Sequence, residues 1–101
     1  MSEKVELFDQ PFNSLERAME IATRRQEIIS NNIANAKTPG YNALTFDEEL
    51  MAAVERLDNK KVVLEAELAD LTENSIKYSS YVKLLSSKIN VLRTIVTQGR
   101  R

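Results

Sequence analysis

The stretch LEAELADLTENSIKYSSYVKLLSSKINVLRTIV, residues 64–96, decides the fold of this chain. Its apolar residues recur at alternating steps of four and three from Leu64 to Val96, and Ser75 is the one polar member of the series. This heptad pattern is typical of a long amphipathic helix that packs against another helix. The predicted packing stripe consists of Leu71, Tyr78, Val82, Leu85, Ile89, Leu92 and Val96.

A second apolar stripe lies about a third of a turn away on the same predicted helix. It consists of Tyr81, Leu84, Val91 and Ile95. We expect the helix to cover residues 64–98, because acids precede bases along it and Gly99 is a natural stop. The alternatives are one helix buried in a bundle and packing between molecules. The chain has too few other elements to cover both stripes, which favours packing between molecules.

A second long helix is predicted at residues 11–36. Pro11 suits a first helical turn, where its missing N–H would have no partner. The apolar positions again step by four and three, with Gln26 in the one gap. They are Phe8, Phe12, Leu15, Met19, Ala22, Ile29, Ile33 and Ala36.

Residues 37–63 are predicted to form a turn, a short helix and a connector. Pro39-Gly40 suits a type II turn, in which glycine takes a positive φ. Thr45 with Glu48 three residues later has the pattern of a capping box that starts a helix. The apolar face of this helix would be Phe46, Leu50, Ala53, Val54 and Leu57. Residues 60–63 fit either an extended segment or the start of the next helix.

The predicted fold class is therefore all-α, with residues 1–101 as a single domain. Helices over 11–36 and 64–97 would be about 39 Å and about 51 Å long at 1.5 Å per residue. Both lengths exceed what a compact chain of this size accommodates. We expect two terminal amphipathic helices that form an elongated, coiled-coil-like hairpin.

The composition argues against an enzyme and against metals or cofactors. The chain has no histidine and no cysteine, which removes the usual general base and the commonest metal ligands. The formal net charge is −1, so nothing indicates a nucleic-acid partner. No apolar run is long enough for insertion into a membrane. Glu3, Glu6 and Asp9 occupy the place of the basic region of a signal peptide, so we expect no cleaved signal.

Charge is nevertheless segregated along the chain. Residues 1–46 carry 5 basic and 6 acidic groups, and residues 47–73 carry 3 basic and 9 acidic groups. Residues 74–101 carry 6 basic groups and no acidic group. We expect the acidic and basic blocks to set the register between neighbouring molecules.

One segment at the end of the first predicted helix has an unusual composition, with three asparagines within five residues. A simple helix cap and turn would need only one of them. The segment resembles the N-terminal signature of the flagellar rod, hook and hook-associated protein family, in which an Asn-Asn-Ile-Ala-Asn core precedes a Thr-Pro-Gly-Tyr turn. The matching residues are Asn31, Asn32, Ile33, Asn35, Thr38, Pro39, Gly40 and Tyr41. The C-terminal region resembles the proximal rod members of that family.

This resemblance implies a structural subunit of the bacterial flagellar basal-body rod that is needed for motility. It implies export by the flagellar type III system, a periplasmic location in the rod, and self-association in a helical assembly. The implied partners are rod subunits of the FlgC, FlgF and FlgG types, the FliE adaptor and the export gate. The runner-up is a cytosolic helical export chaperone or a coiled-coil adaptor.

Some members of that family use an exposed phenylalanine followed four residues later by an apolar residue to engage the export gate. Phe46 and Leu50 fit this candidate export motif. Phe8 and Phe12 fit it by spacing alone. The structural alternative is that both pairs are core contacts one helical turn apart. Many relatives have a longer middle section, so we expect no separate outer domain here.

Overall fold

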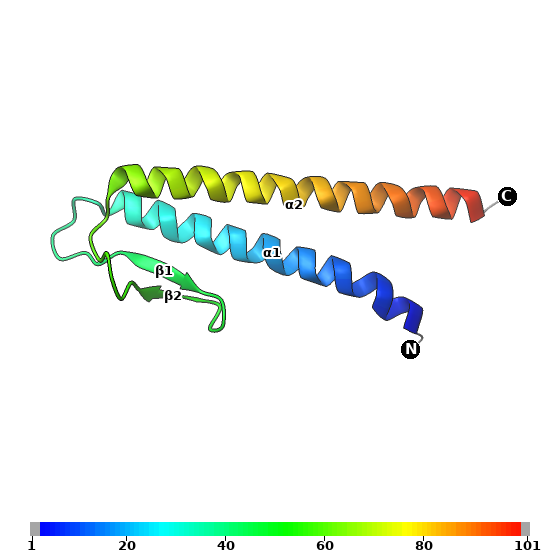
Figure 1. Ribbon diagram of the computed structural model, residues 1–101, viewed down its shortest axis with the longest axis horizontal. Helices are drawn as coiled ribbons and strands as arrows, with labels where there is room; N and C mark the ends of the chain where they lie inside the picture. The colour runs from blue at the N-terminus through cyan, green and yellow to red at the C-terminus, as the bar shows by residue number, and fades with distance from the viewer. Residues whose placement is uncertain (1–2, 100–101) are drawn as a thin grey trace.

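Two long antiparallel helices and a small β-hairpin form an elongated molecule in the computed structural model (Figure 1). The structure describes residues 3–99, and side chains from residue 13 to residue 99. The molecule measures 66 × 26 × 15 Å and has a radius of gyration of 18.7 Å. A compact chain of about 100 residues would have a radius of gyration of about 13 Å. The expected elongated hairpin of two terminal helices is confirmed.

Helix α1 spans Glu3–Ala34 and helix α2 spans Leu64–Gly99. They run side by side, and both ends of the chain lie at the end of the molecule opposite the hairpin (Figure 1). Leu15, Ala22 and Ile28 are the buried apolar residues of α1 in this seam. Neither helix has a stretch of described residues long and apolar enough to cross a membrane.

Helix α1 differs from the expected 11–36 at both ends. It begins at Glu3, so Pro11 lies inside the helix, where it removes one N–H from the hydrogen-bond ladder. It ends at Ala34 instead of residue 36 because the N–H of Ala36 bonds to Ile33, a tighter closing turn at 3.2 Å. The side chains of Phe8 and Phe12 lie outside the described residues, so their predicted place in the stripe is untested.

The predicted short middle helix is wrong, and with it the all-α class. Residues 44–55 form an antiparallel β-hairpin of β1 (Leu44–Asp47) and β2 (Ala52–Glu55). Thr45, the expected helix cap, pairs with Val54 across the hairpin. Leu50 and Leu57, expected on an apolar helix face, are 67% and 97% exposed.

Contacts outside the segment explain why it forms a hairpin. The side chain of Phe46 is buried, with the guanidinium of Arg25 on α1 centred 5.8 Å from its ring. The Asp47 carboxylate accepts the N–H groups of Glu49 and Leu50 at 2.9 Å and 3.1 Å, which closes an Asx turn. These bonds compete directly with the helical pattern that the capping box suggested.

Candidate functional site

Asn32 lies at the centre of the site and is fully buried. Its side-chain amide bonds to both backbone groups of Leu44: Oδ1 accepts the N–H at 2.9 Å, and Nδ2 donates to the carbonyl at 2.9 Å. Oδ1 also accepts the Tyr41 hydroxyl at 2.7 Å, and Nδ2 lies 3.4 Å from Oε2 of Glu67. An amide has two donors and two acceptor sites, so its whole capacity is used. We call Asn32, Tyr41 and Leu44 the asparagine clamp, which ties β1 to α1.

The other two asparagines of the signature bond locally. Asn31 Nδ2 donates to the Tyr41 hydroxyl at 3.0 Å, which leaves that hydroxyl free to donate to the clamp. Asn35 Nδ2 donates to the carbonyl of Asn31 at 2.9 Å, and Oδ1 of Asn35 accepts the Thr38 hydroxyl at 3.2 Å. These bonds satisfy groups left open where α1 ends. Each asparagine thus has a separate role that a simple cap would not require.

The turn of the signature follows the sequence prediction. The N–H of Tyr41 donates to the carbonyl of Thr38 at 3.2 Å, with Pro39 and Gly40 between them. Gly40 has φ of 75°, the positive angle that a type II turn needs at this place. The turn reverses the chain so that Tyr41 returns to α1. Ile33, the remaining signature residue, is half-buried.

A buried ion pair completes the junction between the hairpin and α2. Glu67 is 1% exposed, and its Oε1 lies 2.5 Å from Nη2 of Arg56. Glu67 is one of the acids in the first turn of α2, where a carboxylate also suits the helix dipole, and its burial was not predicted. A buried carboxylate is unfavourable unless it is paired and hydrogen-bonded, and here Arg56 and Asn32 supply both. The junction therefore depends on three elements being in place together.

The seam between the helices contains a second polar contact. Asn74, which is 6% exposed, donates from Nδ2 to the carbonyl of Ala22 at 2.7 Å and to Oε1 of Gln26 at 3.1 Å. The polar gap predicted at Gln26 thus faces a polar residue on the other helix. Ser75, the polar member of the predicted heptad series, lies outside the seam and is exposed. A buried polar pair of this kind sets the register of two helices, because a shifted register would leave it unpaired.

The two predicted stripes of α2 are only partly covered. Leu71, Leu85 and Leu92 of the packing stripe, and Tyr81 of the second stripe, are half-buried. The rest are exposed: Tyr78, Val82, Ile89, Val96, Leu84, Val91 and Ile95. The helix is rotated so that Glu67 and Asn74 point into the seam, which leaves one apolar flank on each side of it.

The candidate export motif does not form a helical pair. Phe46 lies in β1 and is 7% exposed, whereas Leu50 lies in the hairpin turn and points to solvent. Arg25 of α1 bonds to Glu48 in the same turn at 2.6 Å. The turn is thus held close to α1, and only Leu50 of the motif is accessible in this fold.

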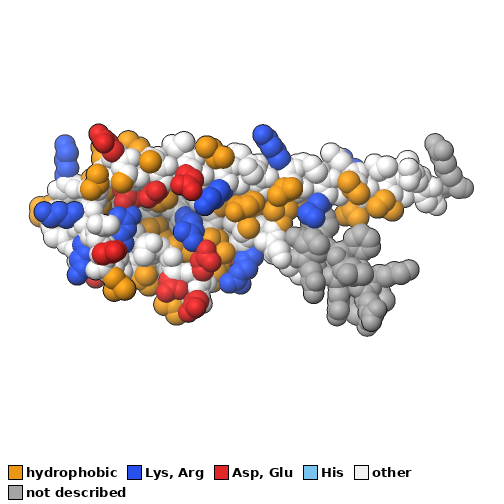
Figure 2. Space-filling view, in the orientation of Figure 1, with side chains coloured by type: hydrophobic (Ala, Val, Ile, Leu, Met, Phe, Trp, Pro, Cys, Tyr) orange, Lys and Arg blue, Asp and Glu red, His pale blue; other side chains and the backbone are white. Residues whose placement is uncertain are grey.

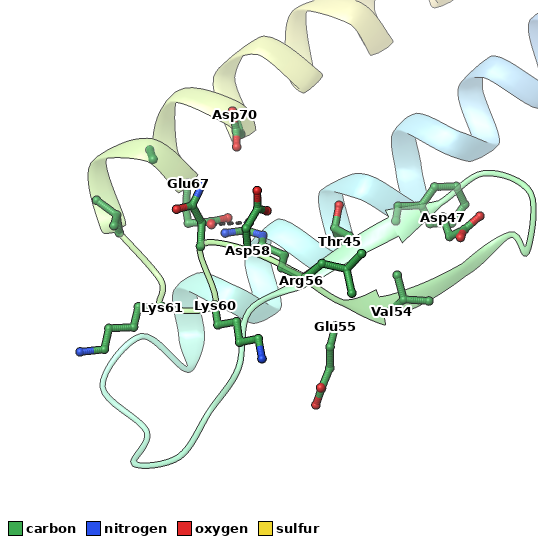
Figure 3. Close-up of a pocket in the computed structure, with 15 residues that line it drawn as sticks. Thr45, Asp47, Val54, Glu55, Arg56, Asp58, Lys60, Lys61, Glu67 and Asp70 are labelled. Atoms are coloured by element: carbon green, nitrogen blue, oxygen red, sulfur yellow. Dashed lines mark hydrogen bonds and ion pairs between the residues drawn. The ribbon is translucent and has the colours of Figure 1, made fainter.

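A groove of about 1160 Å³ separates the hairpin from the first turns of α2 (Figure 3). Arg56 and Glu67 meet across it, while Glu55 and Lys61 point away from it. Its apolar lining includes Val54, Val63 and Ala66. Across the described residues no cluster of potential metal ligands is present. The groove and the flanks of α2 expose both apolar and charged side chains.

Comparison with known proteins is consistent with the signature. Residues 12–42 match a family model described as flagella basal body rod protein. The flagellar basal body rod protein FlgB of Bacillus subtilis (strain 168) is 28% identical over 127 aligned positions, covering 93% of this chain and 98% of the relative. FlgB of Buchnera aphidicola subsp. Acyrthosiphon pisum (strain APS) is 40% identical over 55 residues, which are 54% of this chain and 41% of the relative.

FlgB of Escherichia coli (strain K12) is 23% identical, with 83% of this chain and 91% of the relative covered. The alignment with the Bacillus subtilis protein has 127 positions, and about 94 residues of this chain, 93% of 101, take part in it. The other positions, about 33, are therefore gaps in this chain, where the relative has additional residues. The signature, the clamp that its residues build and the FlgB relatives along most of the chain lead to one conclusion: the chain is similar to flagellar basal body rod proteins.

Proposed function

We propose that this chain is a structural subunit of the bacterial flagellar basal-body rod, in the FlgB position of the proximal rod. One observation carries the proposal: α2 exposes apolar side chains along both flanks of its contact with α1. Leu84, Val91 and Ile95 are 52%, 58% and 52% exposed, and Val96 is 54% exposed. A continuous exposed apolar surface is a mark of an interaction site. Burial of these flanks between subunits would stabilise a helical assembly.

The proposed partners and location follow from the same assignment. The partners are rod subunits of the FlgC, FlgF and FlgG types, the FliE adaptor and the export gate, and the rod lies in the periplasm. We propose export by the type III route without a cleaved signal. We also propose that residues 1–101 act as one domain without a separate outer domain. The family match and the FlgB relatives do not favour the alternative of a cytosolic chaperone or adaptor.

Deletion of the chain in its own organism tests the function. We expect deleted cells to assemble no rod and not to swim, and a plasmid copy to restore swimming. Detergent-extracted basal bodies of the complemented cells should contain the chain, as detected by mass spectrometry. Swimming of the deleted cells, or absence of the chain from purified basal bodies, would refute a rod subunit.

Export through the candidate motif gives a separate prediction. Leu50→Ala is expected to reduce secretion of the chain severalfold without changing its stability, because Leu50 is exposed and supports no core contact. Secreted and cytoplasmic fractions are compared by immunoblotting in cells that export but do not assemble the rod. Leu57→Ala, at another exposed leucine, is the matched control. Equal secretion of Leu50→Ala and the wild type would remove the export role from Leu50.

A further inference from the structure

Two surfaces with complementary properties lie on the same side of α2. The first is the groove beside the hairpin, which includes Val63, Ala66 and Asp70. The second, which we call the outer row, consists of Leu84, Lys88, Val91 and Ile95, beyond the end of the hairpin. Asp70 and Lys88 are 18 residues apart, which is about five full turns, so they project from the same side of the helix.

The groove carries an excess of negative charge. Five acidic and three basic residues line it, and Arg56 is already paired with Glu67. Asp70 is exposed at its edge on α2. Val63, next to the first turn, is 60% exposed, so the groove also offers apolar surface. A helix about 10 Å in diameter could occupy a groove of this volume for about two turns.

The outer row has the opposite charge. Residues 74–99 contain Lys77, Lys83, Lys88 and Arg93 and no acidic residue. The apolar members of the row are about half exposed. Figure 2 shows apolar side chains gathered along α2 beyond the hairpin, with acidic side chains confined to the hairpin end of this face. The row is therefore a basic, apolar helix surface that matches an acidic, apolar groove.

Both surfaces lie on the same side of α2. A single two-fold axis can therefore place the outer row of each copy against the groove of the other copy. We propose that two copies of this chain pair with their α2 helices antiparallel, so that the outer row of each copy lies in the groove of the other. With the axis near residue 79, Asp70 faces Lys88 of the second copy. Val63 faces Ile95 of the second copy in the same arrangement.

This pair goes beyond the proposed function. It is a closed dimer, so it does not grow, and it covers apolar surface of subunits that have not yet been assembled. Rod assembly requires the pair to separate first. The pair leaves Val82, Ile89 and Val96 uncovered, since these residues lie on the other flank of α2, about 130° from the outer row. Substitutions on that other flank can therefore disturb rod assembly without changing the pair.

A charge exchange tests the pair directly. We expect the purified full chain to sediment as a dimer at about 100 µM. Asp70→Lys alone and Lys88→Asp alone should each weaken dimerisation about tenfold, because the two-fold axis places two like-charge pairs in each variant dimer. The double variant should restore the wild-type dissociation constant to within about threefold, since the exchanged charges face each other again.

Three outcomes would overturn the pair: a monomeric wild type at about 100 µM, an open-ended series of oligomers, or a double variant no tighter than the single ones. Circular dichroism at 222 nm on each variant separates loss of pairing from loss of folding. Because these measurements use the purified chain, they remain valid whichever result the deletion of the chain produces for rod function.

Disulfide trapping gives a second measurement of the orientation. The chain has no cysteine, so any disulfide that forms must join the introduced cysteines. A mixture of Val63→Cys and Ile95→Cys proteins should form a disulfide-linked pair under mild oxidation. Ser75→Cys, at an exposed residue on the face of α2 opposite the outer row, should not link to Ile95→Cys. Equal linkage in both mixtures would rule out the antiparallel arrangement.

Discussion

Replacing Val82 and Ile89 together by aspartate is expected to abolish swimming and rod assembly without unfolding the helical hairpin. Both side chains are 38% exposed and lie on the flank of α2 away from the groove. Burial of each apolar side chain between subunits would contribute about 1.5–3 kcal/mol, and a buried unpaired aspartate adds a further penalty. A loss of several kcal/mol at each subunit contact weakens association by about a thousandfold or more.

Swimming in soft agar and the amount of the chain in purified basal bodies measure this effect. Circular dichroism and secretion into the medium show whether the variant still folds and is still exported. Leu57→Asp is the matched control, because it places the same charge at an apolar residue that is 97% exposed and outside this flank of α2. Normal swimming of the double variant would show that this flank of α2 is not a subunit contact.

Asn32→Ala is expected to lower the free energy of unfolding by about 4 kcal/mol. The substitution leaves both backbone groups of Leu44 without partners and removes an acceptor from Tyr41 and a donor from Glu67. Each buried polar group left unsatisfied costs about 1–3 kcal/mol. Urea unfolding followed by circular dichroism measures the change, and hydrogen exchange at the Leu44 amide shows whether the clamp itself has opened.

Asn31→Ala is the control for this clamp variant. Asn31 is exposed, and its side chain donates to the Tyr41 hydroxyl and accepts a longer bond, of 3.4 Å, from Asn35 Nδ2. Because solvent can replace both bonds, its loss should cost less than about 1 kcal/mol. Equal destabilisation by the two substitutions would contradict the central role assigned to Asn32. Unchanged exchange at Leu44 in Asn32→Ala would contradict the clamp.

Local patterns were sufficient for much of the fold. The heptad steps predicted a helix over 64–98, and α2 spans Leu64–Gly99. The Pro39-Gly40 pair predicted a turn with a positive φ, which Gly40 has. Helical periodicity, caps and turn residues act over a few positions, so the sequence alone carries this information. The same holds for the signature at residues 31–41, whose residues are contiguous.

The middle segment was predicted wrongly because its conformation depends on distant residues. Thr45 and Glu48 have the local pattern of a helix start, but Asn32 of α1 binds both backbone groups of the residue before Thr45. The burial of Phe46 beside Arg25 adds a second contact with α1. Such long-range bonds outweigh a local propensity of about 1 kcal/mol.

By itself, the sequence determined that this protein has two long amphipathic helices, an abrupt turn after the first, and more apolar helix surface than one molecule can cover. Only the tertiary structure decided that Asn32, Glu67 and Asn74 are buried and that residues 44–55 form a hairpin. The physical reason is that a polar side chain can be buried only where its partners are, and these partners lie 9–52 positions away along the chain. Periodicity records which faces are apolar, whereas the packed structure alone shows which polar groups meet between them.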